Sequence, residues 1–532
     1  MENPTNTVVP GRRIIKSLGL ASDVRPVNVF SYLLSSFVSI SSLVFLSAAT
    51  SFVLTAVVRV PTDSLGRING SLVLLDEIVA LPMVLIWGQV ADAYGYRLVT
   101  FLGHFIVAVS LSLFVQAKDR YMLYLFRIFI SLGFSALTTM ISAILASMTT
   151  ARLESVKDQE SCNEEQVTED ETTPMLPETK KCNLKYGQRS ARLSGIIGFV
   201  SGLGALFAVF VLLRLPPYFA NLTNYPPREA LRIGVQQAFY LAALIALLIA
   251  VSMIFGLRRD GERLWPLSSG GAGRLTCWTD NLKELLLGFK LGRGHRHLGV
   301  AYAAGFSARA TTIAVSAYFP VYVNQYYISS GKCQLDSPDS PKEDIKKGCH
   351  AAFALASAVT GTVELSALIF APAFGWIAAS YSQPAILAAS NALGAIGFFA
   401  IGFLPTPNHY LIWPTAIILG IAQISGVVVS LSLCASCRWR IHHSKVGNPV
   451  ESTCPMISSS CMGDNRSRFT ARDISGAIAG VYSLCGGLGI LIGSFGGMLA
   501  DWAPSAPFYL SGVLTMIVGL VCCIIFIGDQ KQ

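Results

Sequence analysis

The stretch GQVADAYGYR, Gly88–Arg97, is a short polar segment between two long apolar runs. Gly88 lets two helices approach closely, and Gly95 permits the tight reversal between them, because glycine has no side chain to clash. Asp92 lies where the first run ends, so its carboxylate can pair with Arg97 or face the positive end of another helix. The segment therefore predicts a tight turn between two long helices, with a charge available for a contact beyond the turn.

The composition is that of a membrane protein. Of 532 residues, 52% are hydrophobic and 13% are charged, whereas charged residues make up about 25% of a soluble domain. The apolar runs are continuous rather than alternating, which favours helices over a β-barrel. The first run, 29–58, is longer than a signal-peptide core of about 7–15 residues and should remain in the membrane. A large soluble enzyme with buried helices is the alternative that this composition disfavours.

The apolar runs set the expected domain organisation. Segments of about 20 apolar residues can cross a bilayer, and there are twelve: 30–57, 70–90, 98–117, 121–148, 194–213, 237–257, 298–327, 351–376, 384–404, 410–434, 474–499 and 507–527. The sequence thus predicts an all-α chain with two six-helix bundles. The expected parts are a cytosolic tail (1–28), a first bundle (29–257) with a disordered loop (151–193), a linker (258–297), a second bundle (298–527) with a cytosolic loop (438–473), and a tail (528–532).

The loops indicate which side faces the cytosol. Lys and Arg are more frequent in the loops on the side of both termini, which predicts that the termini are cytosolic. On the opposite side lie the glycosylation sequons at Asn69 and Asn221 and the pair Cys333 and Cys349, expected to form a disulfide. Either the plasma membrane or a vacuolar or lysosomal membrane satisfies this orientation. The segment ETTPML in the loop 151–193 loosely resembles an acidic dileucine sorting signal.

The two halves carry weak traces of an internal repeat. Aligning Gly375 with Gly88 also pairs Glu364 with Glu77 and Asn391 with His104. Further along, Ala191–Gly195 echoes Ala471–Gly476, and Gly202–Leu206 echoes Gly487–Leu491. The echoes keep their order along the chain, which predicts a parallel duplication of one six-helix unit.

The opening segment resembles the loop signature of the major facilitator superfamily. The matching residues are Gly88, Ala91, Asp92, Gly95 and Arg97, while Ala93 and Tyr96 replace two basic residues. A second signature is similar around Arg127 and Gly133, with Ser131 in place of its first glycine. The resemblance implies twelve helices in two pseudo-symmetric bundles, and a latch at Asp92 that favours the state open to the outside.

Six ionisable residues lie inside the expected spans, where each costs about 2.5–3.5 kcal/mol on insertion scales and is a functional candidate. They are Asp76, Glu77, His104, Arg127, Arg309 and Glu364. We expect the last two to meet near the midplane as a buried pair, either broken during transport or acting as a static brace. Asp76, Glu77 and Arg127 suggest a structural ion-pair cluster or a proton relay, and His104 a helix-packing residue or a ligand.

The remaining motifs limit the function. The patterns GxxxxGK[ST], CxxCH and GxSxG do not occur, so we expect neither an enzyme, nor a cofactor, nor a nucleic-acid partner. The spacing of Cys434, Cys437, His442, His443, Cys454 and Cys461 is irregular for zinc, which favours ordinary thiols. The sequence predicts a monomeric secondary transporter that moves a small solute by alternating access, with protons as the candidate coupling ion. A facilitative uniporter and a non-transporting receptor or scaffold are the alternatives.

Overall fold

The computed structural model describes residues 24–58, 62–149, 178–222, 225–258, 288–331, 350–446, 475–500 and 503–530. Within these ranges the chain is helical and contains no strand. Cys333 and Cys349 lie outside them, so the expected disulfide remains a prediction. The same holds for the zinc candidates Cys454 and Cys461, and the side chains of His442 and His443 are not among those described.

The helices follow the apolar runs closely. The first half contains α2 (Pro26–Phe52), η1 (Val53–Val57), α3 (Thr62–Tyr94), α4 (Tyr96–Phe114), α5 (Arg120–Thr149), α7 (Glu178–Phe210), η3 (Leu212–Arg214), α8 (Leu215–Asn221) and α9 (Pro227–Gly256). The second half contains α11 (Arg296–Ile313), η4 (Ala314–Tyr318), α12 (Phe319–Ser329), α14 (His350–Ser380), α15 (Gln383–Phe403), α16 (Ile412–Val446), α17 (Ser475–Ala500) and α18 (Ala506–Gln530). Residues 288–294 are also helical.

Eleven of the described helices are long and apolar enough to cross a membrane. The remaining predicted span, 298–327, is a continuous helical rod made of α11, the π-helical η4 and α12. It is less apolar than the other eleven because α11 carries Arg296, His297 and Arg309. The prediction of an all-α, multi-pass membrane protein is confirmed.

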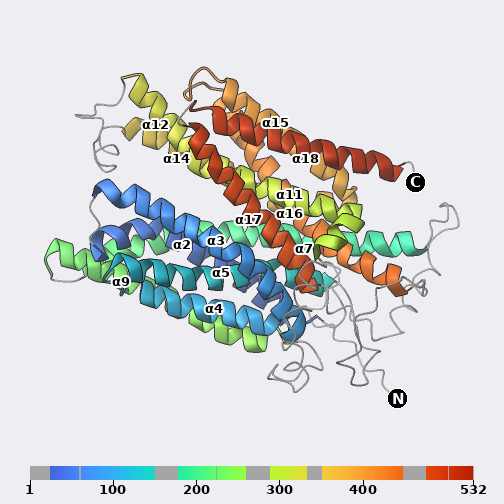
Figure 1. Ribbon diagram of the computed structural model, residues 1–532, viewed down its shortest axis with the longest axis horizontal. Coiled ribbons are helices and arrows are strands. Elements are labelled where there is room, and N and C mark those ends of the chain that lie inside the picture. The colour runs from blue at the N-terminus through green and yellow to red at the C-terminus, as the bar shows by residue number, and fades with distance from the viewer. Residues whose placement is uncertain are drawn as a thin grey trace, which may run out of the picture.

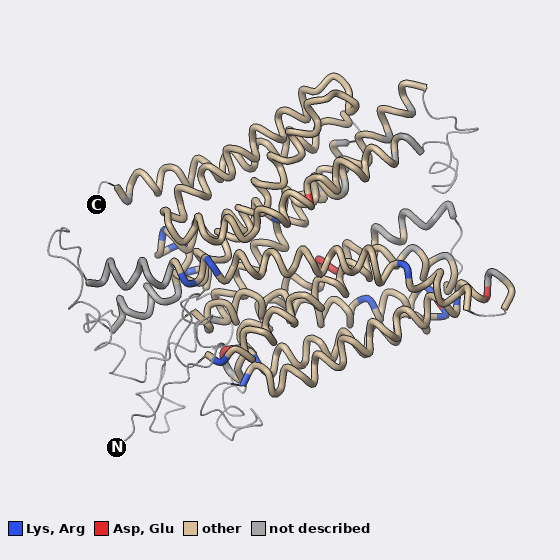
Figure 2. The backbone as a smooth tube through the Cα atoms, turned by 180° about the vertical axis from the view of Figure 1, so that it is seen from behind, with Lys and Arg blue, Asp and Glu red and all other residues tan. Residues whose placement is uncertain are grey.

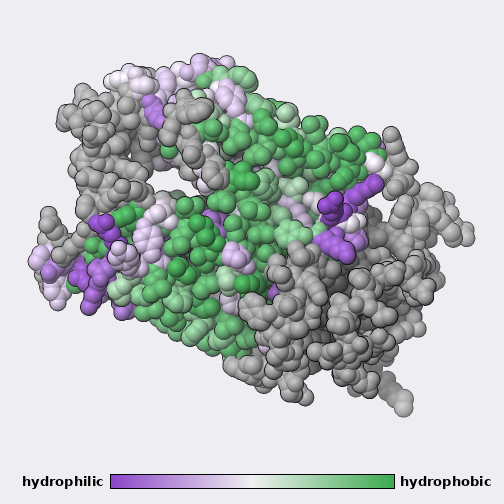
Figure 3. Space-filling view, viewed as in Figure 1, coloured by the Kyte–Doolittle hydropathy of each residue, from purple (hydrophilic) through white to green (hydrophobic). Residues whose placement is uncertain are grey.

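The two halves form two bundles that lie side by side (Figure 1). The first described helix, α2, begins and the last, α18, ends at the same end of the molecule, here called the termini end, and the opposite end is called the far end. Charged residues gather towards the two ends, and few lie between them (Figure 2). The exposed surface between the ends is mainly hydrophobic (Figure 3), as expected for contact with lipid.

The buried core consists of clusters within one half and clusters shared by both halves. One hydrophobic cluster belongs wholly to the first half, around Phe45 and Phe239, and another wholly to the second half, around Phe319 and Phe508. Two further clusters contain residues of both halves; one packs Leu431 of α16 against first-half residues. The bundles are therefore separate cores joined by shared packing.

Three expectations about the connections need correction. The helix α7 begins at Glu178, so part of the expected disordered loop 151–193 is helical, and α16 extends to Val446 into the expected loop 438–473. Polar residues with good helix propensity can continue a helix beyond the membrane, because its hydrogen bonds are internal. Asn69 lies within α3 rather than in a loop, because α3 begins early and buries Ile68 and Leu72. Asn221 is the exposed last residue of α8.

Candidate functional site

Asp92 joins the two bundles at the termini end. Its carboxylate accepts hydrogen bonds from the backbone N–H groups of Gly476 (2.6 Å) and Ala477 (2.8 Å), in the first turn of α17. The unpaired N–H groups there carry partial positive charge, so a carboxylate is stabilised. The contact with a helix end, one of the two that the sequence suggested for Asp92, is present. Gly95 has a φ of 94°, which suits the glycine expected at the reversal.

Close glycine contacts occur at two equivalent places between the bundles. A Cβ atom added to Gly476 would lie 1.9 Å from the carbonyl oxygen of Gly88, and one added to Gly195 would lie 2.7 Å from Cα of Gly375. These contacts join α3 to α17 and α7 to α14. The sequence repeat aligns Gly88 with Gly375 and Gly195 with Gly476, so the repeated residues make equivalent contacts. The duplication is therefore visible as a pseudo-symmetric interface.

The same symmetry continues two turns towards the middle of the molecule. A Cβ atom on Gly487 would lie 3.0 Å from the Leu81 side chain, and one on Gly202 would lie 2.7 Å from the Leu368 side chain. One turn further towards the far end, the repeat places Glu77 in one half and Glu364 in the other. Each glutamate thus lies one turn from a leucine on the same face of the same helix: Glu77 from Leu81 on α3, and Glu364 from Leu368 on α14.

Glu77 lies near Arg309, across the interface between the bundles. Their charges are close enough to interact, although they form no salt bridge. Both side chains lie against consecutive glycines of α17. A Cβ atom added to Gly486 would lie 3.2 Å from Cγ of Arg309, and one added to Gly487 would lie 3.7 Å from Oε2 of Glu77. The Arg309 side chain is exposed although it lies in mid-helix. It therefore borders an open space between the bundles.

The expected pair of Arg309 with Glu364 is not formed. Glu364 lies beside Gln423 of α16, and its side chain is exposed. On α14 it shares a face with Leu368, which contacts α7 of the other bundle. The sequence argument placed both residues at a similar depth, but depth alone does not fix the direction in which a helix face points. The glutamate near Arg309 is the repeat counterpart, Glu77.

Asp76 and Arg127 form an ion pair inside the first bundle. Nε of Arg127 donates to both carboxylate oxygens of Asp76 (2.9 and 2.8 Å), and a terminal guanidinium nitrogen donates to one of them at 2.6 Å. The Arg127 guanidinium also donates to Thr50 (3.2 Å), so the pair ties α3 and α5 to α2. The structure shows this ion pair, its structural role stays a prediction, and Glu77 faces the other bundle.

His104 is buried and packs inside the first bundle. Its Nε2 lies 2.9 Å from Oγ of Ser35, which links α4 to α2. Its repeat counterpart Asn391 accepts a hydrogen bond from Ser307 (2.9 Å), which links α15 to α11 in the same way. This geometry favours a helix-packing role for His104.

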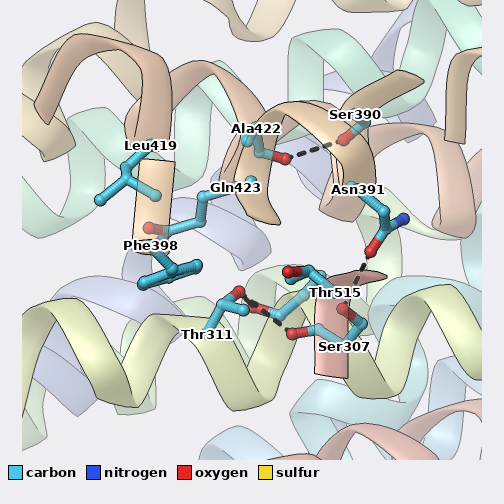
Figure 4. A pocket seen from close by; sticks show the side chains of 12 residues that line it. Ser307, Thr311, Ser390, Asn391, Phe398, Leu419, Ala422, Gln423 and Thr515 are labelled. Atoms are coloured by element: carbon cyan, nitrogen blue, oxygen red, sulfur yellow. Dashed lines mark hydrogen bonds between the residues drawn. The ribbon is translucent and has the colours of Figure 1, made fainter. Parts of the chain in front are cut away.

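A cavity of about 20 Å³ with both polar and apolar lining lies inside the second bundle, next to the Ser307–Asn391 bond. Figure 4 shows Thr311, Gln423 and Thr515 around it. Its volume suits about one water molecule. It is too small for a solute, so the space between the bundles is the candidate site.

The described parts of the two bundles separate towards the far end. Figure 3 shows a gap between the two halves on that side. At the termini end the halves are closed by the Asp92 contact, the two glycine contacts and the buried Ser190–Ser432 pair (Oγ–Oγ 3.0 Å). The bundles thus touch at the termini end and separate towards the far end. Glu77, Arg309 and Glu364 lie at mid-helix between these ends, and Arg309 and Glu364 are exposed. This level is here called the floor of the space between the bundles.

Comparison with solved structures identifies the architecture. The chain is similar to the human organic anion transporter MFSD10 (12% identity, TM-score 0.55, covering 93% of this chain and 99% of that one). It is also similar to the E. coli fucose:proton symporter FucP (13%, 0.56, 93% and 98%) and to the proton:xylose symporter XylE (11%, 0.57, 93% and 94%). The chain has the major facilitator superfamily fold. No protein-family model matches it, and no characterised protein matches it in sequence.

Within the major facilitator fold, sequence reasoning missed three features of the site. Gly486 and Gly487 make room for Arg309 and Glu77, Tyr482 lies one turn away with its hydroxyl 2.9 Å from Ser430, and Gln423 lies beside Glu364. The repeat echo at Gly487 was the available signal for the glycine pair. Gln423 and Tyr482 are uncharged, so a search for charges inside spans does not find them.

Proposed function

We propose that this protein is a secondary active transporter of a small solute, driven by a proton gradient and working by alternating access. The single observation that carries this proposal is a pair of pseudo-symmetric halves that touch at one end, separate at the other, and carry exposed ionisable side chains at mid-helix. Such side chains are costly inside a membrane and are usually functional. The charge distribution of the loops supports a cytosolic closed end.

The structural neighbours add support for this class of function. Their names describe an organic anion transporter, a fucose:proton symporter and a proton:xylose symporter. Organic anions and monosaccharides are therefore the first solutes to test. The plasma membrane and a vacuolar or lysosomal membrane are the proposed locations, and a monomer is the proposed functional unit.

Flux into reconstituted proteoliposomes tests the proposal. Labelled monosaccharides and organic anions are supplied with and without a pH gradient across the vesicle membrane. Uptake that the gradient accelerates supports proton coupling, and uptake that ignores the gradient indicates a uniporter. Binding of a solute without any flux would instead indicate a receptor or scaffold and would overturn the proposal.

Replacing Glu364 with glutamine probes the site directly. The variant removes a charge from an exposed side chain at the floor of the space between the bundles without changing its size, so expression should be intact. We expect gradient-driven uptake to fall by at least about tenfold, equivalent to about 1.4 kcal/mol. Unchanged uptake by Glu364→Gln would show that this carboxylate has no part in transport.

A further inference from the structure

The two symmetric glutamates have different surroundings. Glu77 lies near the guanidinium of Arg309, whereas Glu364 lies near the amide of Gln423 and no described cation. Between Gly195 and Phe210, α7 carries no titratable residue, and Glu364 is the only acidic residue of α14. The two repeats therefore differ in charge: Glu77 has the positive charge of Arg309 nearby, and Glu364 has no such charge among the described residues.

Arg309 is not held as a structural cation is held. Arg127 is buried and makes a bidentate ion pair, whereas Arg309 is exposed and forms no salt bridge with any described carboxylate. The glycines at 486 and 487 leave the surface of α17 without side chains between Arg309 and Glu77. The guanidinium thus has free donors in a space that a small group can enter.

We propose that Arg309 binds the anionic group of the transported solute, a carboxylate or a group of similar charge, and that Glu77 competes with the solute for this guanidinium. Guanidinium groups recognise carboxylates through paired hydrogen bonds. This inference rests on the proposed transport function, to which it adds a substrate class. Glu77 and Arg309 belong to different bundles, so rocking of the bundles changes the distance between the carboxylate and the guanidinium.

Protonation of Glu77 completes the scheme. A proton that enters from the open end and neutralises the carboxylate removes the competitor, and Arg309 then faces the solute anion alone. The other charged or titratable groups nearby are Asp76, which Arg127 engages, and Tyr482, which lies near Arg309. The proton and the anion together add no net charge to the space between the bundles.

A cysteine reporter tests the local charge without knowledge of the solute. Thr312 lies about one turn from Arg309 towards the open end and is partly exposed. In purified Thr312→Cys protein without other accessible cysteines, we would measure labelling rates with an anionic and a cationic methanethiosulfonate reagent. The ratio of the anionic to the cationic rate cancels the intrinsic reactivity of the thiol and reports the local potential.

The proposal makes four linked expectations for this ratio. Arg309→Gln should lower it at least about 3-fold, since unit charges a turn apart interact by roughly 1 kcal/mol even in a wet site. Arg309→Lys should keep it, and Glu77→Gln should raise it. Lowering the pH should raise it in the parent and leave it unchanged in Glu77→Gln.

A reporter beside Glu364, on another helix of the same half, is the matched control. A side chain at Gly361 would occupy open space one turn from Glu364, so Gly361→Cys should prefer the cationic reagent and should ignore Arg309→Gln. A Thr312→Cys ratio that does not respond to Arg309→Gln would overturn the anion site. Labelling requires no flux, so failure of the transport proposal would appear separately, in the proteoliposome assay.

Discussion

The Asp92 carboxylate is a single side chain that links the two bundles at the closed end of the molecule. A hydrogen bond to a charged group contributes about 1.5–3 kcal/mol, and Asp92 makes two across the interface. Asp92→Asn should therefore shift the equilibrium towards opening at the termini end by roughly tenfold. The measurement is maleimide labelling of a Ser190→Cys reporter, because Ser190 is buried while this end is closed.

Labelling in Asp92→Asn should rise while labelling of Thr312→Cys, on the far side of the closure, falls. Opposite changes in the two labelling rates distinguish a shift between conformations from a general destabilisation of the fold. If both reporters became more reactive, the bundle would be destabilised and the latch interpretation would be wrong.

The Asp76–Arg127 pair should affect stability rather than the conformational equilibrium. Breaking a buried ion pair by removing one partner leaves the other charge unpaired and costs about 3 kcal/mol. Asp76→Asn should thus lower the melting temperature in detergent. In the double variant Asp76→Leu with Arg127→Met no charge is left unpaired, so it should melt above the single variant. A double variant that melts lower would show that the pair itself stabilises the bundle.

At the scale of helices, the closure depends on residues without side chains. A methyl group at Gly476 would lie 1.9 Å from the backbone oxygen of Gly88, and neither backbone can give way cheaply. Gly476→Ala should therefore hold the termini end open, and Ser190→Cys should label at least tenfold faster than in the parent. Gly361→Ala is the control, because its methyl group would meet nothing within 4 Å. Equal labelling of the two variants would contradict a tight α3–α17 contact.

The sequence predicted the helices well and the site only in part, for separable reasons. Span positions follow from apolar runs, since a segment in lipid must satisfy its own backbone hydrogen bonds. The contact of Asp92 with a helix end was foreseen as one of two options. The partner of Arg309 was not, because it depends on how helices rotate about their axes, which an apolar run does not encode. The repeat at Glu77 held the information that was needed.

The polar extensions of α7 and α16 show a second limit. Both continue beyond the apolar runs, where neither hydropathy nor sidedness specifies the structure. Their positions were expected to be loops because they are charged. Helix propensity, rather than polarity, decides whether such a segment stays helical.

For the whole molecule, alternating access requires the two bundles to separate at the termini end in every cycle. Oγ of Ser190 in the first bundle lies 3.0 Å from Oγ of Ser432 in the second. In a background with Cys434 and Cys437 replaced by serine, Ser190→Cys with Ser432→Cys should form a disulfide that stops flux and leaves Thr312→Cys accessible. Reduction should restore flux, and each single cysteine variant should be insensitive to oxidant. A cross-linked protein that still transports would show that the bundles do not rock about this contact.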